Sequence, residues 1–86
     1  MRLDKFLKVS RLIKRRTVAK ELADKGRVVI NGRAAKAASD IQIGDVLEIH
    51  FGQKTLTVKV KDLQESPKKE EAGSLYEVLS EESSVL

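Results

Sequence analysis

The chain has 86 residues and a formal net charge of +4, and its 41% hydrophobic and 35% charged residues are typical of one small globular domain. It contains no cysteine, which excludes disulfides, thiolate nucleophiles and zinc sites built from thiolates. No apolar run approaches the length of a membrane span, and the first residues lack the apolar core of a signal peptide, so we expect a cytoplasmic protein with no membrane partner.

The first third of the chain predicts two short helices. Apolar residues at helical spacing predict an amphipathic helix over residues 3–10, with Asp4 among the polar side chains on its outer face. A second helix follows, with Thr17 as its N-cap and Gly26 as the left-handed residue that ends it. The residues expected on its buried face are Val18, Leu22 and Ala23.

After Gly26 the apolar residues alternate with polar ones, which is typical of strands. Residues 28–30 lead into Asn31-Gly32, a pair typical of the type I′ turn of a β-hairpin. Residues 46–51 and 55–61 show the same alternation, so each is expected to be a strand with one buried face. We therefore expect an α+β fold in which two short helices pack on one side of a small antiparallel sheet of three to five strands.

The composition changes from Ser66 onward. Residues 66–73 are polar and rich in turn-forming residues, and the remaining residues are acidic and contain several serines. We expect residues 1–65 to form the folded domain and residues 66–86 to form a polar linker and a flexible acidic tail, which is either disordered or weakly helical through Leu75 to Leu79. Deletion of this tail is expected to leave folding almost unchanged.

Positive charge is concentrated near the N-terminus. The first 36 residues contain twelve Lys and Arg side chains against three acidic ones, a net charge of +9, whereas the other 50 residues have a net charge of −5. Such asymmetry in a small domain is typical of a protein that binds a polyanion. Arginine suits this task because its planar fork donates two parallel hydrogen bonds to a phosphate.

The aromatic residues limit the kind of polyanion. Phe6 and Phe51 fall on expected core faces, so the chain lacks the exposed aromatic surface on which single-stranded bases stack. These residues therefore favour structured RNA or duplex DNA, bound through its backbone, over single-stranded nucleic acid. A DNA-binding helix-turn-helix remains an alternative, although the second helix offers few side chains that read bases. Binding to a membrane surface is disfavoured because the basic helices lack bulky exposed apolar residues.

We expect no enzymatic activity, no cofactor and no metal site. His50 is the only histidine, and it lies on the outer face of an expected strand. Asp40, Asp45 and Glu48 could be imagined as metal ligands, but turn formation explains the two aspartates more simply. The glycine-containing segment at residues 32–36 has neither the spacing nor the ending of a phosphate-binding loop.

A combination of short motifs resembles the S4-type RNA-binding domain. The matching segments are Arg2–Leu7, Arg16–Ala19 and Gly26–Gly32, together with isolated positions at Arg11, Lys36, Ser39 and Gly44-Asp45, so that the resemblance covers about residues 1–60. It implies that the two helices and the hairpin bind structured RNA, chiefly through phosphates. Arg15 departs from the family, which more often has serine or threonine there. The candidate RNA-binding residues are Arg2, Lys5, Arg11, Lys14, Arg15, Arg16, Lys20, Asn31 and Lys36.

Among proteins with this domain, the chain is similar to the small factors of bacterial ribosome-associated quality control and to the fifteen-kilodalton heat-shock ribosome-binding proteins. The resemblance implies a protein that binds the rRNA of a stalled large ribosomal subunit together with its peptidyl-tRNA, and we expect it to be a monomer. The resemblance also implies that the protein supports an RqcH-type factor that adds alanine to the stalled chain. An accessory factor in ribosome assembly or rRNA processing remains the alternative.

Overall fold

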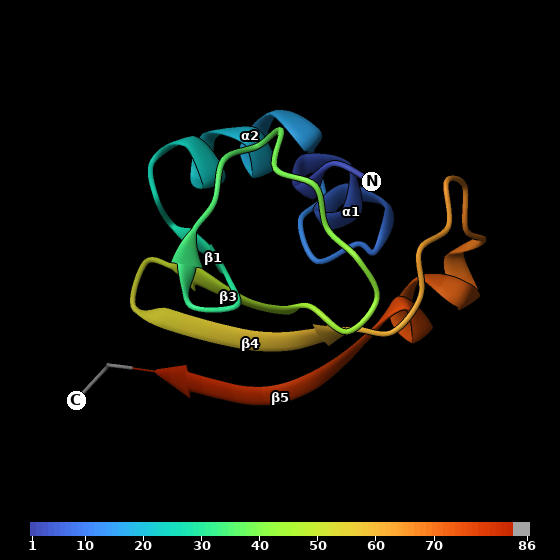
Figure 1. The fold of residues 1–86 in the computed structure, drawn as a ribbon. Helices are drawn as coiled ribbons and strands as arrows, with labels where there is room; N and C mark the ends of the chain where they lie inside the picture. Colours follow the sequence, from blue (N-terminus) through green and yellow to red (C-terminus); the bar gives the residue numbers. More distant parts are fainter. Residues whose placement is uncertain (84–86) are drawn as a thin grey trace.

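The computed structural model describes residues 1–83 (Figure 1). Its five strands form one antiparallel sheet in the order β2-β1-β3-β4-β5, and α1 and α2 lie together on one side of it. This arrangement confirms the expected α+β fold. The elements in chain order are α1 (Leu3–Val9), α2 (Arg16–Asp24), β1 (Val28–Ile30), β2 (Arg33–Ala34), β3 (Val46–Phe51), β4 (Lys54–Val60), the 3-10 helix η1 (Lys69–Leu75) and β5 (Tyr76–Ser83).

The core lies between the helices and the sheet. Helix α1 contributes Leu3, Phe6 and Leu7, each of which is fully buried. The sheet contributes the inward-facing residues of β3 and β4, because successive side chains of a strand point to opposite faces. These residues, all of them fully buried, are Leu47, Ile49, Val58 and Val60.

Helix α2 packs on this core with Ala23 and Leu22, as expected, and with Ala19 in place of Val18. It begins at Arg16 with Arg15 as the N-cap residue, so the prediction of Thr17 as N-cap was wrong. Ala19 and Ala23 are fully buried, whereas Val18 is 41% exposed. The small side chains of Ala19 and Ala23 let the helix backbone lie close to its neighbours. The helix therefore buries these two alanines, although Val18 is the more hydrophobic residue.

The hairpin between β1 and β2 has the expected geometry. Asn31 and Gly32 have φ angles of 50° and 84°, and positive φ at both central residues defines the type I′ turn. The Asn31 side chain also joins the hairpin to the start of β3. Its Nδ2 donates to Asp45 Oδ1 at 3.0 Å, and its Oδ1 accepts from the backbone N–H of Val46 at 2.9 Å.

The C-terminal segment differs most from expectation. Residues 69–83, expected to belong to a disordered tail, form η1 and β5. Ala72 and Leu75 are buried, and Leu75 is part of the hydrophobic core. Strand β5 pairs with β4 along its whole length, with a bulge near Thr57 and Val58.

The prediction of a disordered tail is therefore wrong for residues 69–83, and residues 84–86 lie outside the described part of the chain. The reason is that β5 is an edge strand: its backbone groups on one side form hydrogen bonds with β4, while most of its side chains stay in solvent. A polar composition is compatible with such an edge strand, so composition alone did not distinguish it from disorder.

Candidate nucleic-acid interface

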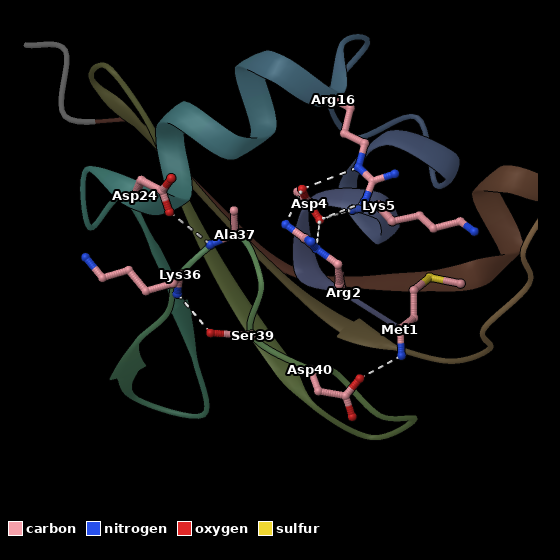
Figure 2. Close-up of polar contacts among 10 residues, drawn as sticks. All are labelled: Met1, Arg2, Asp4, Lys5, Arg16, Asp24, Lys36, Ala37, Ser39 and Asp40. Atoms are coloured by element: carbon pink, nitrogen blue, oxygen red, sulfur yellow. Dashed lines mark hydrogen bonds and ion pairs between the residues drawn. The ribbon is translucent and has the colours of Figure 1, made fainter.

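Asp4 is the centre of the candidate site (Figure 2). Its side chain, at the start of α1, is only 4% exposed, so the expectation that it lies on the polar outer face was wrong. Arg2 Nε and Nη2 donate to the two carboxylate oxygens at 3.1 and 3.3 Å. Arg16 Nη2 and Nε lie 3.4 and 3.3 Å from the same two oxygens. We call Asp4, Arg2 and Arg16 the arginine clamp.

The charge of Asp4 is stabilised by these two arginines. Burial alone would raise the pKa of the carboxyl group. Hydrogen bonds from Arg16 and Arg2, and the positive charges of both guanidinium groups, outweigh that effect and lower the pKa below its ordinary value. The backbone N–H of Lys5 also donates to Asp4 Oδ1 at 2.8 Å. Asp4 therefore remains a carboxylate at neutral pH.

The clamp orients two arginines without burying them. The Arg2 and Arg16 side chains are 51% and 48% exposed, although the carboxylate between them is buried. Each guanidinium group has five N–H donors, and the bonds to Asp4 use only part of them. The remaining donors of two arginines, one before α1 and one at the start of α2, are thus held side by side for phosphate oxygens.

Residues 37–41 fix the start of α1 and therefore the position of Arg2. The N-terminal ammonium of Met1 pairs with Asp40 Oδ1 at 2.8 Å (Figure 2). The backbone N–H groups of Leu3 and Asp4 donate to the carbonyl groups of Ser39 and Ala37 at 2.8 and 3.1 Å. The N-terminus is thus held on both sides of Arg2, and the clamp forms on a fixed backbone.

A second group of cations surrounds the turn between α1 and α2. Lys8, Arg11 and Lys14 are exposed and have no ion-pair partner within residues 1–83. They line a groove of about 530 Å³, whose opposite side is formed by residues 65–67. We call this the basic groove. Arg11 has a φ of 63°, a left-handed conformation that is unusual for a residue other than glycine and that makes the turn tight.

Lys5 lies between the two groups. Its backbone N–H contacts Asp4, and its side chain forms an ion pair with Glu65 at the margin of the basic groove. The ion pair joins α1 to the segment after β4, sixty positions further along the chain. Lys5 therefore connects the arginine clamp to the groove.

The remaining candidate residues belong neither to the arginine clamp nor to the lining of the basic groove. Arg15, the N-cap of α2, and Lys20 within α2 are both exposed. Lys36 is exposed in the loop after β2, where its backbone N–H donates to Ser39 Oγ at 2.9 Å. The side-chain amide of Asn31 is engaged by Asp45 and Val46, so this residue supports the hairpin.

Sequence reasoning missed three residues of the site. Lys8 extends the basic groove, and Glu65 lies in a segment that was expected to be the edge of the folded domain. Asp4 was visible as an acid next to Arg2 and Lys5 in a strongly basic segment, and that isolation is the signal that could have identified it as their partner.

The residues considered for catalysis or metal binding have structural contacts. His50 Nδ1 lies 3.0 Å from Thr55 Oγ1 across the β3–β4 pair, and its Nε2 lies 3.9 Å from Glu48. Asp45 holds its turn by accepting from the backbone N–H of Gln42 at 2.8 Å. Within residues 1–83, no three His, Asp or Glu side chains are grouped to hold a metal ion. No helix in the same part of the chain is long and apolar enough to cross a membrane.

Comparison with known proteins identifies the family to which the chain belongs. Residues 1–47 match the S4 domain, and the chain therefore belongs to the S4 domain family. This confirms the resemblance seen in the sequence, and the matched region includes the arginine clamp and the α1–α2 turn.

Individual relatives show which branch of the S4 domain family the chain resembles. The chain is 63% identical over 82 residues to the RQC P-site tRNA stabilizing factor of Bacillus subtilis (strain 168), with 95% of each chain covered. It is 34% identical over 82 residues to Heat shock protein 15 of Escherichia coli (strain K12), covering 94% of this chain and 62% of that protein. Within the S4 class, the chain thus belongs to the family of the RQC P-site tRNA stabilizing factors.

A solved structure supports the same fold. The trimeric structure of Heat Shock Protein 15 from Vibrio cholerae matches with a TM-score of 0.84 at 28% sequence identity. The match covers 93% of this chain and 82% of that chain. The similarity therefore extends beyond residues 1–47 to most of the sheet.

Proposed function

We propose that this protein is an RNA-binding factor of ribosome-associated quality control. It binds a large ribosomal subunit that carries a stalled peptidyl-tRNA, contacts rRNA and tRNA together, and holds the tRNA at the P site. The observation that carries the proposal is the 63% identity, over 95% of both chains, to a protein named for stabilizing P-site tRNA. Location in the cytoplasm follows from association with ribosomes.

The site supports binding to an RNA backbone. The arginine clamp offers two guanidinium groups in a fixed orientation, and the basic groove offers three further cations around the α1–α2 turn. Phosphate contacts of this kind provide most of the affinity of such interfaces and make it depend strongly on salt. Two separate groups of cations also suit a factor that bridges two RNA molecules.

We further propose that the protein acts by binding and not by catalysis. It supports an RqcH-type factor, which brings alanyl-tRNA and extends the stalled chain, by keeping the peptidyl-tRNA in position. A monomer is sufficient for this role. The acidic edge strand β5 supports a monomer, because self-pairing at that edge would bring glutamates of two copies together.

Affinity for defined ribosomal particles tests the proposal. We expect the protein to bind large subunits bearing peptidyl-tRNA at least about ten-fold more tightly than empty large subunits, since a second RNA contact multiplies the first. Intact ribosomes should compete poorly. Equal affinity for empty and obstructed subunits would contradict the proposal and favour a ribosome-assembly or rRNA-processing factor.

A reconstituted reaction tests the link to alanine addition. It contains obstructed large subunits, an RqcH-type factor and alanyl-tRNA, with or without this protein. Omission of the protein should reduce alanine addition sharply. The combined Arg11→Ala and Lys14→Ala variant should reduce it too, because both residues are exposed cations of the basic groove. Undiminished alanine addition without the protein would contradict this part of the proposal.

A further inference from the structure

Glu65 is the acidic residue of the basic groove. It lies at the groove with Lys8, Arg11 and Lys14, and its carboxylate forms an ion pair with Lys5. The Glu65 side chain is 72% exposed, so packing in the core does not explain why a glutamate stands at this position. A carboxylate in a groove that is otherwise suited to phosphate opposes the binding of any polyanion there.

The segment just before Glu65 is held by contacts that do not involve the ion pair. The N–H groups of Lys61 and Asp62 both donate to the carbonyl group of Leu75, at 2.8 and 3.2 Å. The Asp62 carboxylate then accepts from the backbone of Leu63 and the side chain of Gln64, each at 2.9 Å. Because Leu75 is fully buried, the core holds the segment that presents Glu65 to the groove.

An ordinary surface ion pair is the simpler interpretation. It accounts for the contact with Lys5, but it does not account for the position of Glu65 among three cations that have no partner within residues 1–83. The residues that meet here also come from different parts of the chain, since Lys8, Arg11 and Lys14 lie inside the region that matches the S4 domain and Glu65 lies outside it.

We propose that Glu65 is a selectivity residue that weakens the binding of generic RNA and is displaced only by RNA that engages the arginine clamp and the basic groove together. This inference rests on the proposed RNA-binding function and adds a named determinant of specificity. Generic RNA, held by charge alone, loses affinity to the carboxylate. RNA that reaches both groups of cations gains enough contacts to displace it. The class of ligand for the groove is an RNA backbone phosphate.

The test compares Glu65→Gln with Glu70→Gln, which changes the net charge equally at an exposed position in η1. The probes are a mixed-sequence RNA duplex and large ribosomal subunits bearing peptidyl-tRNA. Loss of an exposed ion pair is worth up to about five-fold, so Glu65→Gln should raise duplex affinity about five-fold. Glu70→Gln should change it by less than about two-fold. The preference of Glu65→Gln for obstructed subunits over duplex should fall correspondingly.

A second variant locates the effect in the groove. Adding Lys14→Ala should remove most of the affinity that Glu65→Gln gains, because the released groove then lacks one of its cations. Equal gains from Glu65→Gln and Glu70→Gln would overturn the inference while leaving RNA binding itself intact. If the unsubstituted protein bound neither probe, the proposed function and this inference would both be overturned.

Discussion

The arginine clamp and the basic groove both present cations from α1, α2 and the residues next to these helices, but they differ in what holds those cations. In the clamp, the buried carboxylate of Asp4 fixes Arg2 and Arg16, each about half exposed. In the groove, Lys8, Arg11 and Lys14 are exposed with no ion-pair partner within residues 1–83. The clamp therefore provides orientation, and the groove provides positive charge that is free to meet a phosphate.

This difference predicts two kinds of contribution to binding. Guanidinium groups that are oriented during folding lose little conformational freedom when RNA binds, so they favour one arrangement of phosphates. Mobile exposed cations attract any polyanion, and their contribution decreases as salt increases. The clamp should therefore favour RNA with one arrangement of phosphates, and the cations of the groove should set how strongly salt affects binding.

The largest expected effect concerns the support of the groove. Leu75 is fully buried and accepts the hydrogen bonds that hold the segment leading to Glu65. Leu75→Ala keeps that carbonyl group but removes buried side-chain atoms, so it should lower the free energy of unfolding by about 2–4 kcal/mol, measured by urea denaturation. Leu79→Ala is the matched control, because Leu79 is 49% exposed in β5. Equal and small effects of both substitutions would show that the C-terminal segment does not belong to the core.

The next largest effect is a difference in the free energy of unfolding between variants of the clamp and variants of the groove. The combined Arg2→Ala and Arg16→Ala variant leaves the buried Asp4 carboxylate without its guanidinium partners, and should lower the free energy of unfolding by about 2–3 kcal/mol. The combined Arg11→Ala and Lys14→Ala variant removes the same charge from exposed positions, and should change it by less than about 0.5 kcal/mol. Similar losses in both variants would break the distinction.

Acid should weaken the clamp. Because the pKa of Asp4 is lower in the folded protein than its ordinary value of 3.8, the unfolded chain binds a proton there more readily. The stabilisation by ionised Asp4 is therefore fully present above about pH 3.8 and is lost as the pH falls through the lower, folded-state pKa. Unfolding measured between pH 7 and pH 2 should show that Asp4→Asn loses less stability in acid than the unsubstituted protein. Parallel pH profiles would contradict the lowered pKa.

The smallest effect on the protein itself is expected in the groove. Lys14→Ala should leave stability unchanged and reduce the slope of log affinity against log salt by up to about one unit, the value for one lost phosphate contact. Binding of the RNA duplex measured across a range of salt concentrations checks this. A slope identical to that of the unsubstituted protein would remove Lys14 from the interface.

The elements that could be predicted from the sequence are those determined by residues close together in the chain. The Asn31-Gly32 turn and the helix end at Gly26 were predicted because positive φ angles, 50° and 84° in the turn and 76° at Gly26, favour asparagine or glycine. The alternation of apolar and polar residues identified β3 and β4, because each of these strands has one buried face. The basic residues could be proposed as a group from their density alone.

The parts that were missed depend on contacts between distant residues. Strand β5 exists because β4 pairs with it, and its own side chains remain mostly exposed. The burial of Asp4 requires Arg16, twelve positions later, to reach the same carboxylate as Arg2. Glu65 contacts Lys5 although the two residues are sixty positions apart in the sequence. None of these contacts leaves a periodic signal in the sequence.

The orientation of the Arg2 and Arg16 guanidinium groups, and not only their charge, should determine RNA binding. Replacing Arg2 and Arg16 together by lysine keeps the charge opposite Asp4 but removes the planar forks. The affinity for large subunits bearing peptidyl-tRNA should then fall at least about ten-fold, whereas the combined Arg11→Lys and Arg15→Lys variant should lose less than about three-fold. Equal losses in the two double variants would contradict the claim and leave total charge as the explanation.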